Sequence, residues 1–330
     1  MYILGINTSH HGSICLLKDG EVILFLEEER TSRKKYSYIT NEYCSAFSEI
    51  KKYTDKVDYV CFGYAASIPK QYCGMQSLDK FIEIYDLLGT SDEYPQFYNL
   101  DQTNILNELH KITHSNTKFS VLEFSHHNFH AAQTFYNSGF DEAVCVVIDG
   151  HGCPDKNNLN LRERESIYKF NYYNNGEQLY CNYNSEGNGI ASLYAMTNIQ
   201  IGFSEFEEGK TMGLSSYKPS DASTELTSDK IQMANNTQKT TQLMALDLIK
   251  HAIEISGSKN VCISGGYGLN CVANYYFRKN LPADVNLYCE PIANDAGQSV
   301  GVSKFVYHYL TGDTTIRPQN SIYYGPNPEY

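Results

Sequence analysis

The sequence predicts an α/β protein of two lobes with a duplicated architecture. First, its 330 residues exceed the about 250–300 residues at which single hydrophobic cores stop growing. Second, hydrophobic residues make up 42% and charged residues 19% of the chain, as in an ordinary globular protein. Third, the order of strand, glycine turn and hairpin occurs twice. We therefore expect a first lobe over 1–140, a second over 141–315, and a tail or linker over 316–330.

The first block opens with apolar segments separated by glycine and asparagine. YILGIN (2–7) predicts a strand. SICLLKDGEVILFLEE (13–28) predicts a hairpin, because Asp19-Gly20 at its centre is a strong turn signal. The tyrosine-rich sequence over 65–118 indicates helices and loops, and FSVLEF (119–124) predicts a short strand.

The second block repeats this pattern. AVCVVIDGHG (143–152) predicts a strand with a glycine turn, and 166–184 predicts a hairpin around Asn175-Gly176. Apolar periodicity then predicts, in order, a helix over 240–256, a strand over 260–266, a helix over 267–280, a strand over 285–290 and an amphipathic helix over 295–310. The serine- and threonine-rich stretch over 213–230 indicates a loop, and the tail over 316–330 has the composition of a linker or an unpacked end.

Charge and cysteine content narrow the function classes. Twenty-six basic against 38 acidic residues give a formal charge of −12, so no overall field attracts nucleic acid or anionic lipid. The ten cysteines form no C-x-x-C pair and no short zinc spacing, which indicates reduced core thiols. Without a signal segment or an apolar run of about 18 residues, the expectation is a soluble, cytoplasmic protein.

The strongest local signal is the sequence HHNFHAA (126–132). His126 and His130 stand four residues apart, so a helix presents both on one face, where they can bind one divalent metal. Asp295, at the start of a predicted helix, is the best further ligand. Two histidines and one carboxylate suit iron, manganese or zinc. The alternative is that both histidines line a helix without an ion.

Glycines at strand ends form a second signal. A missing Cβ lets backbone N–H groups approach phosphate oxygens, although such glycines are also ordinary turn residues. Asp149 ends the strand VVID, a place suited to water-mediated contacts with a metal or hydroxyl. The glycines in question are Gly5, Gly12, Gly150, Gly152, Gly265, Gly266, Gly268 and Gly297.

Two further segments contain basic side chains that could bind an anion. EEGKTMGL (207–214) is similar to the end of a phosphate-binding loop, but Ser204 stands where the required glycine would be, which excludes a P-loop. Lys210 there is either a phosphate ligand or a solvent-exposed lysine. The basic run ERTSRKKY (29–36) is either an anion clamp or a solvated loop.

In order, these motifs resemble the amino-terminal domain of the O-carbamoyltransferase family, which includes nodulation protein U and the cephem and tobramycin carbamoyltransferases. That domain resembles Kae1 and has the actin/hexokinase/Hsp70 (ASKHA) fold. The segments that carry the resemblance are ILGINTSHHGSICLLKDGEV, LEEERTSRKK, HHNFHAA, AVCVVIDGHG, SLYAMTNIQIGF, EGKTMGL, SGGYGLNCVAN and PIANDAGQSVG.

The resemblance implies a metal and nucleotide cleft between the lobes, with Fe²⁺ expected and Mn²⁺ or Zn²⁺ as alternatives. It makes His126, His130 and Asp295 the metal ligands and gives catalytic roles, near the carbamoyl group and its acceptor, to His10, Arg33 and Lys35. The residues expected to bind ATP or carbamoyl-adenylate are Asp149, Gly150, Gly209, Lys210, Gly213, Gly265, Gly266 and Asn270.

The implied reaction makes carbamoyl-adenylate from carbamoyl phosphate and ATP and moves the carbamoyl group to a hydroxyl. The acidic chain favours a small-molecule or free-nucleotide acceptor, including a hydroxymethylated nucleobase, over duplex DNA. The basic run over 30–35 keeps DNA as an alternative acceptor. The resemblance also implies a homodimer. Family members continue into a YrdC-like domain that makes the adenylate. We therefore expect that domain on a separate chain, on a part of the protein beyond Tyr330, or replaced by another carbamoyl source.

The sequence departs from the family pattern at two places. The family's His-Asp-Ala-Ser is here His10-His11-Gly12-Ser13, and the histidine after the basic pair is here Tyr36. These changes concern the acceptor site more than the metal. The main alternative function is a non-catalytic, nucleotide-binding scaffold or regulatory subunit. A sugar or acetate kinase of the same superfamily would not need the histidine pair.

Overall fold

The computed structural model describes most of the chain as two compact units. The described residues are 1–39, 45–63, 118–120, 126–155, 158, 160–174, 176–185, 187–218, 220 and 227–326. Unit 1 comprises Met1–Asp141, Tyr172–Asn175 and Asn294–Tyr330, and unit 2 comprises Glu142–Asn171 and Gly176–Ala293. The chain thus returns to unit 1 at 172–175 and again from residue 294, whereas the sequence predicts a second lobe over 141–315.

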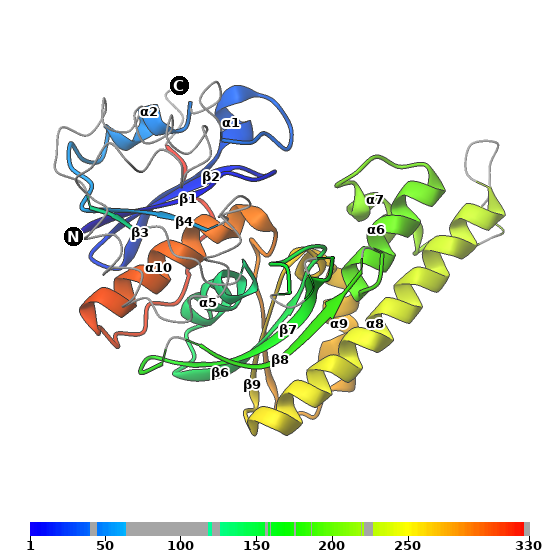
Figure 1. The fold of residues 1–330 in the computed structure, drawn as a ribbon. Coiled ribbons are helices and arrows are strands. Elements are labelled where there is room, and N and C mark those ends of the chain that lie inside the picture. The colour runs from blue at the N-terminus through cyan, green and yellow to red at the C-terminus, as the bar shows by residue number, and fades with distance from the viewer. Residues whose placement is uncertain are drawn as a thin grey trace. The chain divides into compact units, whose positions relative to one another are not determined.

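Unit 1 is built on a five-stranded sheet in the order β3-β2-β1-β4-β5 (Figure 1). β1 pairs antiparallel with β2, and β2 with β3, while β4 and β5 are parallel to β1. The strands are β1 (Tyr2–Asn7), β2 (Ser13–Lys18), β3 (Glu21–Glu27), β4 (Tyr59–Phe62) and β5 (Lys118–Ser120). Asp19 and Gly20 both have positive φ, which confirms the predicted hairpin turn between β2 and β3.

Five helical segments belong to unit 1, among its described residues. They are α1 (Glu28–Ser32), α2 (Phe47–Ile50), α5 (His126–Ser138), the 3₁₀ turn η3 (Asp295–Gly297) and α10 (Gln298–Thr311). α10 lies against both β1 and α5 (Figure 1). A Cβ at Gly5 would lie 2.0 Å from the Ser299 carbonyl oxygen, and one at Gly301 would lie 2.2 Å from that of Phe129. Glycine is therefore required at both close approaches.

Unit 2 repeats the strand arrangement of unit 1. Its sheet has the order β10-β9-β6-β7-β8, with β6, β7 and β8 antiparallel and β9 and β10 parallel to β6. Its strands are β6 (Glu142–Ile148), β7 (Arg162–Asn171), β8 (Glu177–Asn184), β9 (Asn260–Ser264) and β10 (Asn286–Cys289). The predicted duplication therefore holds at the level of topology.

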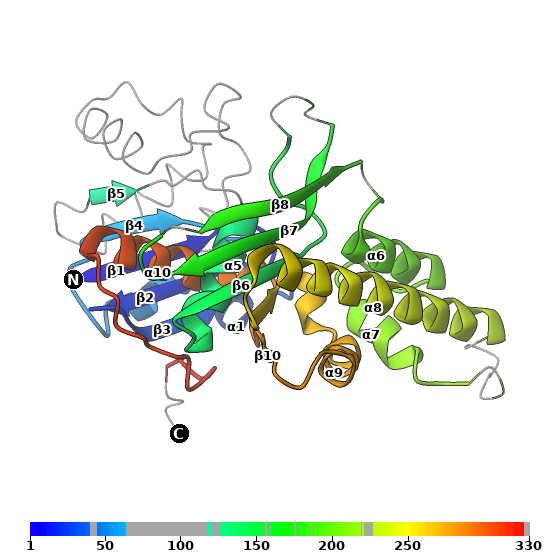
Figure 2. The same ribbon diagram turned by 90° about the horizontal axis from the view of Figure 1, so that it is seen from below.

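The helices of unit 2 include a pair that lie side by side, α6 and α8 (Figure 2). The helical segments are α6 (Ile190–Ile201), α7 (Glu208–Leu214), α8 (Ser228–Ser256), the 3₁₀ turn η2 (Gly266–Leu269) and α9 (Cys271–Asn280). The core of the unit joins β6 and β9 to the helices, with Val146 and Ile263 packed among residues such as Ile249 and Phe277.

Three sequence predictions need correction. α8 begins at Ser228 rather than near 240, because Ile231 and Ala234 are buried against Ile201 and Leu214. The predicted loop over 213–230 is therefore helical at both ends. The helix predicted over 267–280 is interrupted by Asn270, which caps α9. The prediction for 65–118 lies outside the described residues except at Lys118, as does that for 121–124.

The interpretation of 316–330 as an unpacked end is wrong for its described part, which is hydrogen-bonded to unit 1. The interpretation as a linker stays a prediction. The backbone N–H of Gln319 donates to the Asn137 carbonyl oxygen at 2.9 Å, and that of Phe25 donates to Tyr324 at 3.1 Å. The second contact covers the outer edge of β3, the last strand of its sheet. Within the described residues, no helix has the length and apolar character needed to cross a membrane.

Candidate functional site

α5 presents two buried histidines on one face. His126 and His130 stand one helical turn apart, and their side chains are 2% and 0% exposed. Their rings meet edge to face with centroids 4.8 Å apart. Gln298 at the start of α10 donates to the His126 carbonyl oxygen at 3.3 Å, which joins the first turn of α5 to α10. This bond fixes the backbone at the start of α5, from which both histidines project.

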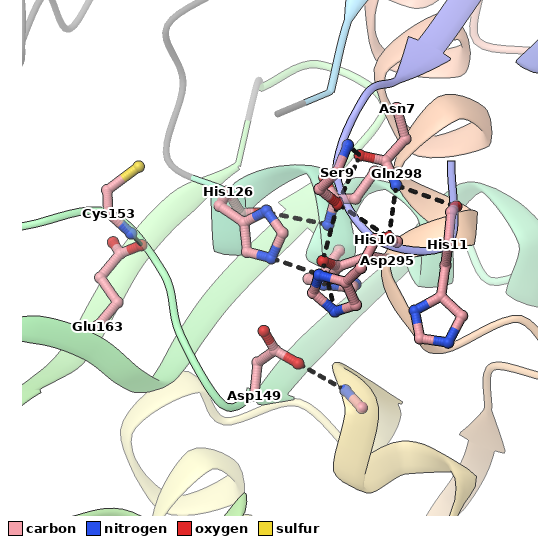
Figure 3. Close-up of polar contacts among 12 residues, drawn as sticks. Asn7, Ser9, His10, His11, His126, Asp149, Cys153, Glu163, Asp295 and Gln298 are labelled. Carbon is pink, nitrogen blue, oxygen red and sulfur yellow. Dashed lines mark hydrogen bonds and ion pairs between the residues drawn. The ribbon is translucent and has the colours of Figure 1, made fainter. Parts of the chain in front are cut away.

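Asp295 faces this pair from the turn η3. Its Oδ1 lies 3.3 Å from His126 Nε2 and 3.4 Å from His130 Nε2 (Figure 3). Its other oxygen, Oδ2, lies 3.1 Å from Ser9 Oγ and 3.3 Å from His10 Nε2. Burial alone would raise the pKa of Asp295, but the neighbouring histidines hold it well below its usual value. The carboxylate is thus ionised, with one oxygen toward α5 and the other toward the β1–β2 turn.

Asn7 organises that turn. Its buried side chain accepts from the Ser9 N–H at 3.2 Å and donates to the His11 carbonyl oxygen at 3.2 Å. Ser13, at the start of β2, donates to the Ala296 carbonyl oxygen at 2.6 Å and so ties the turn to η3. Sequence reasoning did not identify Asn7 and Ser9, because their role comes from these bonds.

The three side chains form a donor set of the kind that binds a transition metal. The ligand atoms of His126, His130 and Asp295 all lie within 4.8 Å of one another, and all three residues are buried. Burying a carboxylate beside two imidazoles in a folded core is costly unless the charge has a partner. Two imidazoles and one carboxylate fit iron, manganese or zinc and leave positions for other ligands.

The predicted acceptor-side residues lie on two parts of unit 1. His10 belongs to the cluster around Asp295 and is 30% exposed. Arg33 ends α1 with a φ of 60° and is exposed, and Lys35 Nζ stands 4.7 Å from the centre of the Tyr36 ring. The Tyr36 ring in turn meets the His11 ring edge to face at 5.1 Å.

The two departures from the family pattern are thus in contact with each other. Gly12 also contacts the segment that follows Tyr36, because its N–H donates to the Ser37 carbonyl oxygen at 2.7 Å. A Cβ there would lie 2.6 Å from the Ile39 nitrogen. The family's alanine would not fit at this position unless the segment 37–39 moved. The close packing of this segment on the β1–β2 turn therefore requires the glycine.

In unit 2, the ends of β6 and β9 form a glycine-rich edge. Asp149 Oδ1 accepts from the Gly266 N–H at 2.7 Å (Figure 3). Gly265 has a φ of 85°, and a Cβ there would lie 2.4 Å from the Ile148 carbonyl oxygen, so this glycine is required by the fold. Around Gly150, in contrast, a Cβ would meet nothing within 4 Å. The prediction that these turns contact a nucleotide stays a prediction.

A buried arginine holds the Asp149–Gly150 turn. Arg164 lies at a register shift of β7 and is fully buried. Its carbonyl oxygen accepts from the Asp149 N–H at 3.1 Å, and its Nη1 donates to the Gly150 carbonyl oxygen and to Ser192 Oγ. Sequence reasoning missed Arg164, because in RERES it has the pattern of a charged strand surface.

The other predicted nucleotide residues lie elsewhere in unit 2. Asn270 accepts from the Ala273 N–H as the cap of α9 and donates to Gln238 at 3.0 Å, so its side chain already has partners. Lys210 lies on α7, with Nζ 2.6 Å from Glu207. Gly209 and Gly213 lie on the same helix, where a Cβ at either would meet nothing within 4 Å.

The cysteines of the described residues are free thiols. Cys145 and Cys262 face each other across neighbouring strands, and burial raises the pKa of Cys145 well above its usual value. Such thiols act as small apolar side chains. Cys44 and Cys73 lie outside the described residues.

Comparison with known proteins places the chain in a family. Residues 2–244 and 232–303 match the family described as carbamoyltransferase N-terminus. Protein sll1178 of Synechocystis sp. is 25% identical over 383 aligned positions, covering 98% of this chain and 60% of that protein. Nodulation protein NolNO of Sinorhizobium fredii is 21% identical, covering 96% of this chain and 49% of that protein. The chain thus spans between about half and three fifths of these relatives.

Solved structures show the fold. Full-length HypF, in a phosphate- and nucleotide-bound form, superposes with a TM-score of 0.55 at 13% identity, covering 95% of this chain and 56% of HypF. HypF of T. kodakarensis gives a TM-score of 0.53. This likeness and the repeated strand order confirm the predicted actin/hexokinase/Hsp70-like fold. The family match extends over nearly all of both units, and the chain therefore belongs to the carbamoyltransferase N-terminus family.

Proposed function

We propose that this chain is the carbamoyl-transferring part of an O-carbamoyltransferase. It would take the carbamoyl group from carbamoyl-adenylate, made from carbamoyl phosphate and ATP, and place it on a hydroxyl. The acceptor would be a small molecule or a hydroxymethylated nucleobase or nucleotide. The observation that carries the proposal is the buried group of His126, His130 and Asp295 in a member of this family.

The three buried side chains would hold a divalent metal, with Fe²⁺ expected. When bound, it would supply Lewis-acid polarisation of carbonyl and phosphate oxygens. Ser9 and His10 would fix the orientation of the carboxylate, because both contact its Oδ2. Such contacts to the second oxygen of a ligand commonly tune metal affinity.

His10 is the proposed general base. Its Nε2 faces Asp295 Oδ2, so its Nδ1 would accept the proton of the acceptor hydroxyl. The hydroxyl oxygen would then form a bond to the carbamoyl carbon while the bond from that carbon to the adenylate phosphate breaks. The products are the O-carbamoylated acceptor and AMP, with the proton left on His10. The 30% exposure of His10 is compatible with access by an acceptor.

In unit 2, the turns after β6 and β9 would bind the nucleotide through backbone N–H groups. Arg164 would hold the first of these turns in position, which its bonds to the Gly150 carbonyl oxygen and the Asp149 N–H support. Arg33 and Lys35 would attract the anionic donor toward unit 1. The carbamoyl-adenylate itself would come from a YrdC-like domain, on the same protein or on a partner.

The first test is metal content after anaerobic purification of the wild type, His126→Ala and His127→Ala. His127 is the matched control, because it is a buried histidine of the same helix that stands outside the donor set. We expect about one transition metal per chain in the wild type and the control, and a loss in His126→Ala. Full metal content in His126→Ala would contradict the proposed ligand set.

The second test supplies carbamoyl-adenylate chemically and measures carbamoylation of a panel of hydroxyl acceptors. We expect turnover by the wild type and His127→Ala but none by His126→Ala. If the wild type binds ATP or AMP but contains no metal and shows no turnover, the proposal is wrong. A non-catalytic nucleotide-binding subunit would then replace it.

A further inference from the structure

Unit 2 contains a pocket that the proposed reaction does not use. It is partly open to solvent, has a volume of about 560 Å³, and lies among β7, β8, α6 and α8. Ligand pockets in proteins commonly measure about 300–1,000 Å³. The residues that line it are Glu165, Tyr180, Asn182, Asn184, Gly187, Asn188, Gly189, Ile190, Leu193, Met244, Asp247, Leu248 and His251.

The charge of this lining is negative. Glu165 and Asp247 contribute carboxylates, and no lysine or arginine lines the pocket. Among the residues that the structure describes, neither acid forms an ion pair. The only other titratable side chains of the lining are Tyr180 and His251, whose rings meet edge to face at 5.8 Å. The pocket therefore disfavours phosphates, nucleotides and carboxylates.

Glu165 is the buried end of the pocket, with 4% of its surface exposed. Its Oε1 accepts from the Ile190 N–H at 2.6 Å at the start of α6, and its Oε2 accepts from Asn182 Nδ2 at 2.7 Å. Burial nevertheless raises its pKa, so these two bonds do not fully replace the water that it lost. The neighbouring Arg164 lowers this pKa only in part, so a further cation would favour the ionised carboxylate.

The remaining walls are apolar and aromatic. Ile190, Leu193 and Leu248 supply aliphatic surface, and Met244 stands on α8 with 43% of its surface exposed. Tyr180 leaves 37% of its surface exposed. A tyrosine ring attracts an ammonium group placed over its face. The pocket thus combines an apolar lining with two acids and one accessible ring.

We propose that this pocket binds an organic cation, an ammonium group carried on an apolar chain or ring. The ammonium group lies beside Glu165 and Asp247, and the apolar body lies against Leu193, Met244 and Leu248. Nothing in this binding depends on carbamoyl transfer, so the proposal stands or falls apart from the proposed function.

The test is ligand-observed saturation-transfer NMR on the full chain with four probes. Cadaverine and phenethylamine are the cations on a chain and on a ring, 1,5-pentanediol is the neutral counterpart, and glutarate is the anionic one. The variant is Asp247→Asn, and the matched control is Glu254→Gln, an exposed acid of the same helix outside the lining. Both substitutions remove one charge and leave the side-chain shape unchanged.

We expect at least one amine to bind, with affinity that falls as salt is added. Asp247→Asn should weaken that binding about tenfold and Glu254→Gln should leave it unchanged. Equal binding of pentanediol, equal binding by both variants, or no binding of either amine would each overturn the proposal.

Discussion

The two sheets share a strand order, yet their first strands end differently. β1 ends at Asn7, whose amide holds a turn that contains Ser9, His10 and His11. β6 ends at Ile148, and the next residue, Asp149, accepts from Gly266 at the end of β9. The same backbone frame therefore supports a histidine-rich turn in unit 1 and a glycine-rich edge in unit 2. The residues at the end of the first strand thus differ in kind between the two units.

The interiors of the units differ as well. In unit 1, α10 approaches β1 so closely that Gly5 is required, and the buried contacts include Ser13 with Ser299. In unit 2, the equivalent strand β6 carries Val144 and Val146 and packs against aliphatic residues of α8. Unit 1 has an aliphatic core as well, so the difference lies in the contact of β1 with α10. That contact tolerates substitution less than an aliphatic one, because a rigid backbone atom cannot move aside.

The largest expected effect comes from Gly5→Ala. Its Cβ would lie 2.0 Å from the Ser299 carbonyl oxygen, so β1 and α10 would have to separate. We expect unit 1 to lose about 3 kcal/mol or more of stability, measured by denaturant unfolding. Gly150→Ala is the control in unit 2, where a Cβ would meet nothing within 4 Å. Equal stability of the two variants would contradict the difference in packing.

The second-largest effect is a loss of stability of unit 1 in acid. Burial lowers the pKa of His308 on α10 to about 4, and its ring stacks on Tyr136 at 4.3 Å. The unfolded chain binds a proton near pH 6.5, so the stability of unit 1 is complete above that pH and falls between 6.5 and 4. At pH 5 the loss would be about 2 kcal/mol.

His308→Phe removes this titration and keeps a ring against Tyr136. Its unfolding free energy at pH 7 and pH 5 should therefore differ by about 2 kcal/mol less than that of the wild type. The variant loses the contact of Nδ1 with the Asp313 carbonyl oxygen, so it starts from a lower stability at both values. The same pH slope in both proteins would show that His308 is not responsible.

The third effect concerns the metal and distinguishes the two oxygens of Asp295. Asp295→Asn weakens the group that faces both histidines, and we expect metal affinity to fall at least about a hundredfold. Ser9→Ala removes a contact to the other oxygen only, and a loss of about tenfold is expected. Competition with a chelator measures both. A larger loss in Ser9→Ala than in Asp295→Asn would reverse the assigned roles.

Much of the fold could be predicted from the sequence, because local signals fix it. Asp19-Gly20 sets a hairpin through positive φ values, and the apolar runs of β1 and β6 indicate buried strands. The start of α8 could not be predicted, since its first turns are polar and are held by tertiary packing of Ile231 and Ala234. Tertiary contacts override local composition there.

The candidate site was predictable only where residue type and spacing carry the chemistry. The spacing of His126 and His130 indicates a shared helix face, and Asp295 follows from its position before a helix. Asn7 and Ser9 have no such signal, because ordinary turn residues acquire their role from what the fold places beside them. Arg164 is the extreme case, since nothing in its local sequence indicates a buried guanidinium.

The smallest expected effect tests whether Asn270 serves the fold or the nucleotide. Its Oδ1 accepts from the Ala273 N–H at 2.9 Å and caps α9. Asn270→Ala should lose about 1 kcal/mol from the cap alone, whereas Asn270→Ser should retain most of the cap. Both variants also lose the hydrogen bonds of the amide to buried Gln238, so the two are compared with each other at matched stability. If capping is its whole role, nucleotide affinity measured by titration calorimetry stays within about twofold in the serine variant. A selective loss of nucleotide binding in the serine variant, at unchanged stability, would instead make Asn270 a ligand contact. The glycine-rich edge of unit 2 would then extend from Gly266 through η2 to the first turn of α9.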